Sequence, residues 1–155
     1  MPDRRGEGGR LTRRMRTTSY RLRRAPWGIA IDLTAEAGLT PEQPVGGELV
    51  GDRVWLDLAP VLNHPPSDRS GLRITGDEAA WLRHGVALVA GSIAAQNPSL
   101  HTAVTVQRVL FPLTDFQPEG LAAAVLEWTE KEFGLTSYPV EAEFDQRANR
   151  YVYTW

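Results

Sequence analysis

The chain has 155 residues, of which 42% are hydrophobic and 23% charged, and its formal net charge is −2. This length fits a single domain, and the composition is typical of a globular protein rather than a disordered one. The sequence has no cysteine, which excludes disulfides, thiolate metal sites and a cysteine nucleophile. It also has neither an apolar run of ~20 residues for crossing a bilayer nor the apolar stretch of a signal peptide. We therefore expect a cytoplasmic protein without a membrane anchor.

Arginine is concentrated at the N-terminal end of the chain. Nine of the arginines lie within the first 24 residues, where Asp3 and Glu7 are the only acids, so the rest of the chain is acidic. This start is typical of a disordered basic leader, which we assign to residues 1–17, and Met15 is an alternative translation start. The preference for Arg over Lys is typical of a GC-rich, bacterial-like composition. A basic arm also attracts nucleic acid by neutralising phosphates, here through Arg13, Arg14, Arg16 and Arg21.

Period-two alternation in the first part of the domain predicts three strands. Two short ones cover residues 20–22 and 29–33, with a Pro-Trp-Gly sequence as the break between them. The third covers residues 49–58, where Trp55 points to the opposite side from the apolar residues that flank it. We therefore expect Trp55 on the face of the sheet that the helices leave uncovered.

Two segments of this part are predicted to lie outside the strands. Residues 40–43 begin with the Thr-Pro-Glu sequence of a capped helical turn, which Pro44 ends after one turn. Residues 63–71 combine Asn, Pro, Ser, Asp and Gly and predict a long loop. This loop displays His64, whose imidazole is one candidate for a general acid or base.

The clearest helix begins at Thr75. Thr75 and Glu78 have the spacing of a capping box, in which each side chain accepts a hydrogen bond from the backbone N–H of the other residue. Apolar residues at spacings of four, three and four then form a stripe along one side. Gly85 and Gly91 lie inside the helix, where glycine costs roughly 0.5–1 kcal/mol relative to alanine. We expect these glycines to allow close packing of a neighbouring backbone, and the helix to end before Asn97.

A strand and a second helix follow. Residues 102–111 predict a strand whose apolar parity changes halfway, which indicates either a β-bulge near Gln107 and Arg108 or burial of the strand on both faces. The helix is predicted over residues 118–133, with Pro118 at its first position and Gly134 as the left-handed residue that ends it.

Residues 140–145 and 151–155 alternate on either side of a short turn and predict a β-hairpin. The predicted order is three strands, a helix, a strand, a helix and two strands. It indicates an α+β fold over residues 18–155, a two-layer sandwich in which two helices cover one face of a mostly antiparallel or mixed sheet. Strand aromatics are then candidates for a ligand-binding surface on the other face: Trp55, Tyr151, Tyr153 and Trp155.

Residues 71–133 resemble a known domain. They contain the sequences LRHGV (82–86) in the first helix, AVTV (103–106) in the strand and DFQPEGL (115–121) before the second helix. In this order they resemble the domain of elongation factor G and of the tetracycline ribosomal-protection proteins whose fold is shared with part of a small-subunit ribosomal protein. The resemblance implies a βαβα arrangement and no functional residue, because a fold does not specify a function. The phosphate-binding motif of GTPases, Gly-x-x-x-x-Gly-Lys-Ser/Thr, is absent from the sequence.

Candidate residues for catalysis lie in two loops. Asp115 and Glu119 bracket the start of the second helix, and two carboxylates at the edge of a sheet can divide the roles of acid and base. Together with His64 they define the possible acid/base site. His64, His84 and His101 do not have the spacing of a metal-binding motif, so we expect no metal and no other cofactor.

These features support three functional hypotheses. The leading one is a small binding protein without catalysis of its own, which holds a partner protein or an apolar small molecule on the uncovered face with Trp55, Tyr151 and Tyr153. The first alternative is a cofactor-independent isomerase, cyclase or hydrolase that uses the two carboxylates and His64. The second is contact with RNA or the ribosome through the Arg-rich N-terminus, which the acidic remainder of the chain opposes. The uncovered face can also join two copies as a homodimer.

Overall fold

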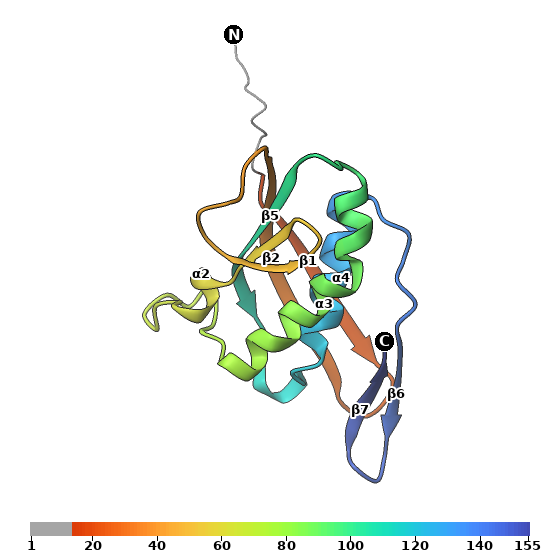
Figure 1. The fold of residues 1–155 in the computed structure, drawn as a ribbon. Coiled ribbons are helices and arrows are strands. Elements are labelled where there is room, and N and C mark those ends of the chain that lie inside the picture. The colour runs from red at the N-terminus through yellow and green to blue at the C-terminus, as the bar shows by residue number, and fades with distance from the viewer. Residues whose placement is uncertain (1–13) are drawn as a thin grey trace.

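The computed structural model describes residues 14–155, which form an α+β fold (Figure 1). A five-stranded mixed sheet carries two long helices on one face, and a two-stranded sheet from the end of the chain packs beside it. The fold class predicted from the sequence is confirmed. The first strand, β1 (Arg16–Arg23), includes two residues that were expected in the leader.

The helices are α2 (Ala59–Leu62), α3 (Gly76–Ala95) and α4 (Gly120–Phe133), with a 3-10 turn η1 (Leu113–Asp115). α3 begins with the predicted capping box. Thr75 Oγ1 accepts from the Glu78 N–H at 3.1 Å, and Glu78 Oε1 accepts from the Thr75 N–H at 2.8 Å. α4 begins two residues after Pro118 and ends, as predicted, at Gly134, whose φ is 65°.

Five strands form the main sheet: β1, β2 (Gly28–Thr40), β3 (Glu48–Gly51), β4 (Val54–Asp57) and β5 (His101–Leu110). Their order is β1-β2-β5-β4-β3. Within this sheet β4 runs parallel to β5, and the other neighbouring pairs are antiparallel. A parallel pair needs a long crossover connection. Here α2 and α3 supply it, which brings α3 onto one face of the sheet (Figure 1).

α3 and α4 pack closely at one glycine. A Cβ on Gly85 would lie 2.6 Å from the carbonyl oxygen of Ala122 and 2.5 Å from Cγ1 of Val125, so only glycine fits between the helices there. Gly91 differs, because a Cβ there would meet nothing within 4 Å. The expected close approach is confirmed at Gly85 and wrong at Gly91.

The two helices cover one face of the main sheet, and the alternation of β4 shows which side chains they bury. Val54 and Leu56 point toward the helices and are fully buried. Trp55 and Asp57 point the other way and are partly exposed. We call this second face the open face.

β2 is longer than predicted. It continues past residue 33 to Thr40 because it pairs with β5 along its second half. The helical turn predicted at residues 40–43 is wrong, since Thr40 Oγ1 accepts from the Glu42 N–H at 3.2 Å in a hydroxyl turn. The bulge expected near Gln107 is confirmed, because the pairing of β5 with β2 skips this residue.

The single strand predicted over residues 49–58 is two strands, β3 and β4, joined by a two-residue turn at Asp52 and Arg53. Arg53 has a φ of 51°, a left-handed conformation that hairpin turns usually give to Gly or Asn. Its side chain donates to the carbonyl oxygens of Leu100 and Ala94, each at 3.1 Å, which offsets the backbone strain. No Asn-Gly or Asp-Gly pair marks this turn, so the sequence pattern does not reveal it.

β6 (Glu141–Asp145) and β7 (Arg150–Thr154) form the predicted hairpin. The hairpin does not join the main sheet, contrary to the expectation of one continuous sheet. Gln117 holds it by donating to the carbonyl oxygen of Tyr151 at 2.7 Å and accepting from its N–H at 2.8 Å. The Tyr151 hydroxyl donates to the carbonyl oxygen of Trp27 at 2.8 Å. Side-chain contacts therefore fix the hairpin at the end of the sheet rather than on its open face.

Candidate functional site

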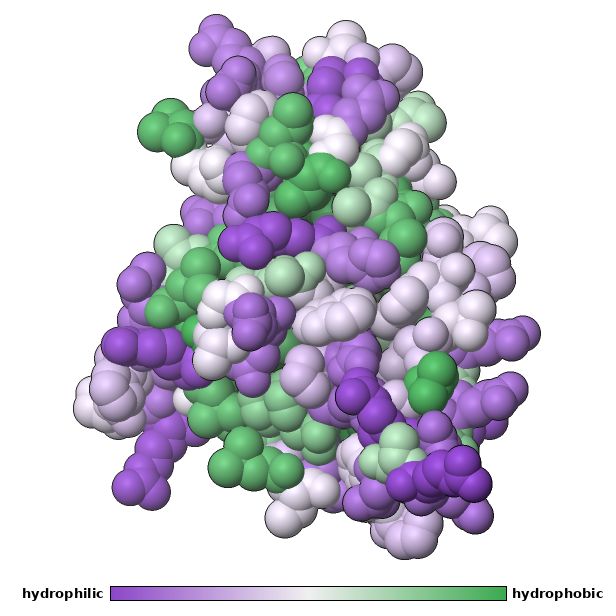
Figure 2. Space-filling view, turned by 60° about the horizontal axis from the view of Figure 1, so that its bottom comes forward, coloured by the Kyte–Doolittle hydropathy of each residue, from purple (hydrophilic) through white to green (hydrophobic). Residues whose placement is uncertain are grey.

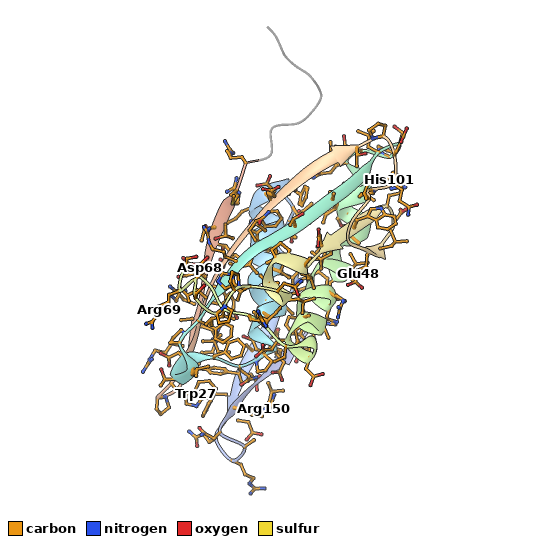
Figure 3. All side chains as sticks on the ribbon, turned by 90° about the vertical axis from the view of Figure 1, so that its left-hand side faces the viewer. Trp27, Glu48, Asp68, Arg69, His101 and Arg150 are labelled. Carbon is orange, nitrogen blue, oxygen red and sulfur yellow. The ribbon has the colours of Figure 1, made fainter. Side chains whose placement is uncertain are left out.

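Residues 41–47, which join β2 to β3 and which we call the strap, lie over the open face. β5 and β4 separate β2 from β3 in the sheet, so this short connection has to cross both strands. At its far end a Cβ on Gly46 would lie 3.4 Å from Asp57 Oδ2, which places the strap directly against β4. Figure 3 views the molecule from this side and labels His101 and Glu48, which flank the strap region.

A cavity of about 430 Å³ lies between the strap and the open face. This volume is within the ~300–1,000 Å³ typical of small-molecule sites. The cavity is lined by Glu42 and Pro44 of the strap, by Trp55 and Asp57 of β4 and by Thr105 of β5, among others. Polar and apolar groups therefore share the same small volume.

The indole of Trp55 is held in place by a neighbouring strand. Its Nε1–H donates to Nδ1 of His101 at 3.0 Å. An imidazole nitrogen that accepts a hydrogen bond carries no proton, so the proton of the neutral His101 ring lies on Nε2. Because the indole N–H is already used, the group that Trp55 offers to the cavity is its aromatic ring.

The cavity is acidic. Glu42 and Asp57 line it, and none of the basic residues within residues 14–155 does. Asp57 Oδ1 accepts from the Ala59 N–H at 3.0 Å, which fixes the carboxylate at the end of β4 with Oδ2 toward the strap. Carboxylates make strong charge-assisted bonds to cations, and an indole ring attracts a cation over its face. These are the groups that recognise an organic cation.

A second cavity of about 260 Å³ lies between β1, α4 and residues 138–142. At this cavity the hydroxyl oxygens of Tyr20 and Tyr153 hydrogen-bond at 2.9 Å. Burial raises the pKa of both phenols, and the nearby Glu127 carboxylate adds to the rise at Tyr20. Both hydroxyls are therefore neutral at neutral pH and serve as donor and acceptor.

The four strand aromatics do not form one surface. Trp55 lies on the open face as predicted, but Tyr151 is 0% exposed, so its predicted place on that face is wrong. Tyr153 lines the second cavity, and Trp155 packs against His84 of α3 with ring centroids 5.2 Å apart. The expectation of an aromatic open face fails because the hairpin that carries these three residues packs elsewhere.

The hairpin and the strap lie at opposite ends of the molecule. In Figure 3, Trp27 and Arg150 lie together at the end far from His101. The Trp27 indole N–H donates to Asn149 in the hairpin turn at 3.0 Å, in agreement with this view. Figure 2, with the bottom of the molecule turned forward, shows apolar side chains in separate groups among polar ones. The aromatics of the hairpin therefore do not extend the cavity beneath the strap.

The three acid/base candidates are not brought together by hydrogen bonds. Asp115 accepts from a backbone N–H at the start of β2 at 3.3 Å, and Glu119 forms an ion pair with Arg150. His64 is 5% exposed, and its Nε2 donates to the carbonyl oxygen of Asp68 at 2.8 Å. None of the three lines either cavity described above. Each therefore has a structural partner of its own.

Two of the arginines predicted to contact nucleic acid are engaged within the fold. Arg16 pairs with Glu132 at 2.8 Å, and Arg21 pairs with Asp32 at 3.0 Å. Arg14 is exposed, and Arg13 lies outside the described residues. Contact with RNA stays a prediction.

Within residues 14–155, no group of three or more His, Asp or Glu side chains is placed to hold a metal ion. No helix in the same part of the chain has the length and apolar character that a membrane span requires.

Alternation along the sequence predicts the place of Trp55 on the open face, but no local pattern predicts the rest of the cavity. Glu42 was assigned to a helical turn, and Asp57 and His101 were given no role. The prolines and glycines of the strap do predict a loop. Its course across the sheet follows from the strand order, which no local pattern records.

Comparisons of the chain with protein-family models, with curated protein sequences and with solved structures find no match. The resemblance of residues 71–133 to a domain of elongation factor G stays a prediction. The geometry of the two cavities is therefore the basis for the functional argument.

Proposed function

We propose that the protein is a binding protein whose ligand is a small organic cation, an amine or guanidinium compound with an apolar body, held beneath the strap. One observation carries this proposal: Trp55 and two carboxylates line a single cavity of about 430 Å³, and no basic residue of the described part of the chain lines it. The proposal keeps the binding role expected from the sequence and narrows the ligand to one with a positive charge.

The residues that line the cavity suit a ligand with a cationic group and an apolar body. A cation over an indole ring gains about 0.5–1 kcal/mol at an exposed site, and a carboxylate beside it adds a charge-assisted hydrogen bond. Glu42 approaches from the exposed strap, and Asp57 is fixed on the floor by its bond to the Ala59 N–H. Pro44 and Ala103 supply apolar contact for the uncharged part of the ligand.

Binding is better supported than acid/base catalysis. A general base has to reach the proton that it removes, and a catalytic pair has to act on one substrate. Asp115, Glu119 and His64 have separate partners and line neither cavity. The carboxylates beneath the strap have no histidine among the residues that line the cavity with them.

Calorimetric titration with phenethylammonium tests the proposal. We expect binding of this probe and at least tenfold weaker binding of the neutral analogue phenethyl alcohol. Glu42→Gln should weaken binding by about two- to fivefold, the range of an exposed ion pair. Trp55→Leu should weaken it by about two- to fivefold through loss of the ring. Glu143→Gln, on the exposed side of β6, is the matched control and should change nothing.

Absence of binding at millimolar probe concentration would contradict the proposal. Equal affinity for the charged and neutral probes would also contradict it, because the carboxylates would then have no role. Circular dichroism of each variant checks that the fold is intact.

A further inference from the structure

β1 is an edge strand of the main sheet, paired with β2 on one side only. In an antiparallel strand each residue directs its N–H and its carbonyl oxygen to the same side, and the side alternates along the chain. A Cβ on Gly28 of β2 would lie 2.6 Å from the carbonyl oxygen of Leu22, so this carbonyl oxygen points toward β2. The N–H of Gly28, which pairs with Arg23, donates to Asp115 rather than to β1. The even-numbered residues of β1 therefore direct their backbone groups to β2, and the odd-numbered residues direct theirs away from it.

This outward edge has free hydrogen-bonding groups. Within residues 14–155, the N–H groups of Thr17, Ser19 and Arg21 have no hydrogen-bond partner beyond the edge. The carbonyl oxygens of Ser19 and Arg21 likewise accept nothing from outside the sheet. A row of free N–H and carbonyl groups is the template onto which an extended peptide adds as a further strand.

The second cavity lies beside this edge. Leu22 lies on its β1 wall, Leu126 of α4 forms its floor, and Val140 lies on its far side. Arg24 and Glu127 are among the charged residues that also line it. A strand added to β1 would direct every second side chain to the helix-covered face of the sheet. One such side chain would enter this cavity, where the two leucines and the valine offer contact to an apolar residue.

The charges of β1 indicate the sign of the partner. Arg21 and Arg23 point to the open face, and Arg24 lines the cavity without an ion pair in the described part of the chain. A second copy of β1 would bring arginines opposite arginines, which destabilises strand pairing. A peptide whose carboxylates lie on the open-face side of the added strand would place these negative charges beside Arg21 and Arg23.

We propose that the edge of β1 binds an extended peptide from another protein, one that alternates apolar and acidic residues, as an additional strand of the main sheet. Its apolar side chain fills the cavity between β1 and α4, and its acidic side chains lie beside Arg21 and Arg23. This peptide site is independent of the cation site beneath the strap.

The test uses a blocked peptide of three Glu-Val repeats and amide hydrogen exchange of the full chain, followed by NMR. In the free protein the amides of Ser19 and Arg21 should exchange quickly, because they face outward. At saturating peptide their exchange should slow by at least tenfold. The amides of Tyr20 and Leu22, which face β2, should change little and serve as internal controls.

Matched probes and variants separate strand addition from simple charge attraction. The same peptide with N-methyl groups on alternate residues, and a peptide of three Lys-Val repeats, should both bind at least tenfold more weakly. Arg23→Glu should weaken binding of the Glu-Val peptide about fivefold, the effect of an exposed ion pair. Arg147→Glu, in the turn of the hairpin, should not.

Three results would overturn the proposal. One is equal binding of the N-methylated peptide, since backbone bonds would then not contribute. Another is binding that protects amides elsewhere and leaves Ser19 and Arg21 unprotected. The third is slow exchange of these two amides in a dimer of the free protein, measured by sedimentation, since a second copy would then occupy the edge.

Discussion

Tyr20 of β1 and Tyr153 of β7 share a hydrogen bond of 2.9 Å between their hydroxyl oxygens, which links the main sheet to the C-terminal hairpin. Burial raises the pKa of both phenols in the folded protein. The stabilisation from a group with a raised pKa is complete below the unfolded pKa, near 10, and is lost as the pH rises through the folded value. The link between sheet and hairpin therefore weakens in alkaline solution.

Tyr20→Phe removes this hydrogen bond. At pH 7 it should lower the free energy of unfolding by about 1 kcal/mol, the net contribution of one hydrogen bond. It should also reduce the loss of stability above pH 10, because the protein then has one phenol fewer with a raised pKa. Urea unfolding at pH 7 and above pH 10 measures both effects, with Tyr138→Phe as the control. Unchanged stability at both pH values would show that the bond contributes nothing.

Gly85 and Gly91 make a matched pair on α3. Gly85→Ala places a Cβ against the backbone of Ala122 and should destabilise the protein by about 1–3 kcal/mol, as overpacking does. Gly91→Ala meets open space and should stabilise it by about 0.5–1 kcal/mol, because alanine favours the helix. Thermal or urea unfolding of the two variants checks the prediction. Equal effects of the two substitutions would contradict the packing described at Gly85.

Gln117→Ala removes both hydrogen bonds to the backbone of Tyr151. It leaves a buried N–H and a buried carbonyl oxygen without their partner, which should cost about 1–3 kcal/mol. Amide exchange in β7 should accelerate more than exchange in β2 or β5, since the hairpin loses its anchor and the main sheet keeps its own pairing. Uniform acceleration throughout the protein would mean that the hairpin is not a separate unit.

Asp68 orders the loop at residues 63–71. The backbone and the hydroxyl of Ser70 both donate to its carboxylate, at 2.9 and 2.7 Å, and hold its pKa below the ordinary value of 3.8. The loop stabilisation is present above the unfolded pKa and is lost as the pH falls through the lowered folded value. Ser70→Ala should move the pKa of Asp68 back up, as seen in an NMR titration of its carboxyl carbon. An ordinary pKa in the unsubstituted protein would contradict this contact.

Sequence patterns predicted the elements whose signals are local. Thr75 and Glu78 are three residues apart and make their capping box within one helical turn. Gly134 ends α4, and the parity change at Gln107 marks the bulge, because each effect depends on neighbouring residues. The turn at Arg53 escaped prediction because contacts with Leu100 and Ala94, far along the chain, offset its strain.

The candidate site was less accessible from sequence for the same reason. The side of β4 on which Trp55 lies follows from alternation, and this was predicted correctly. Trp55 and Glu42 line the same cavity only because the strap crosses two strands. Tyr151 is buried because Gln117 holds β7 against the rest of the fold. Both features depend on packing between residues far apart in the sequence, and the alternation of residues along one strand does not predict such packing.

The most direct measurement of the central claim is an NMR titration of the indole N–H signals with phenethylammonium. Trp55 Nε1–H is bonded to His101 at the cavity, whereas Trp128 Nε1–H is bonded to the Arg16 carbonyl oxygen and its side chain is fully buried. A cation beneath the strap should shift the Trp55 signal in a saturable way and leave the Trp128 signal in place. A Trp55 signal that stays unchanged while the probe binds would contradict the account.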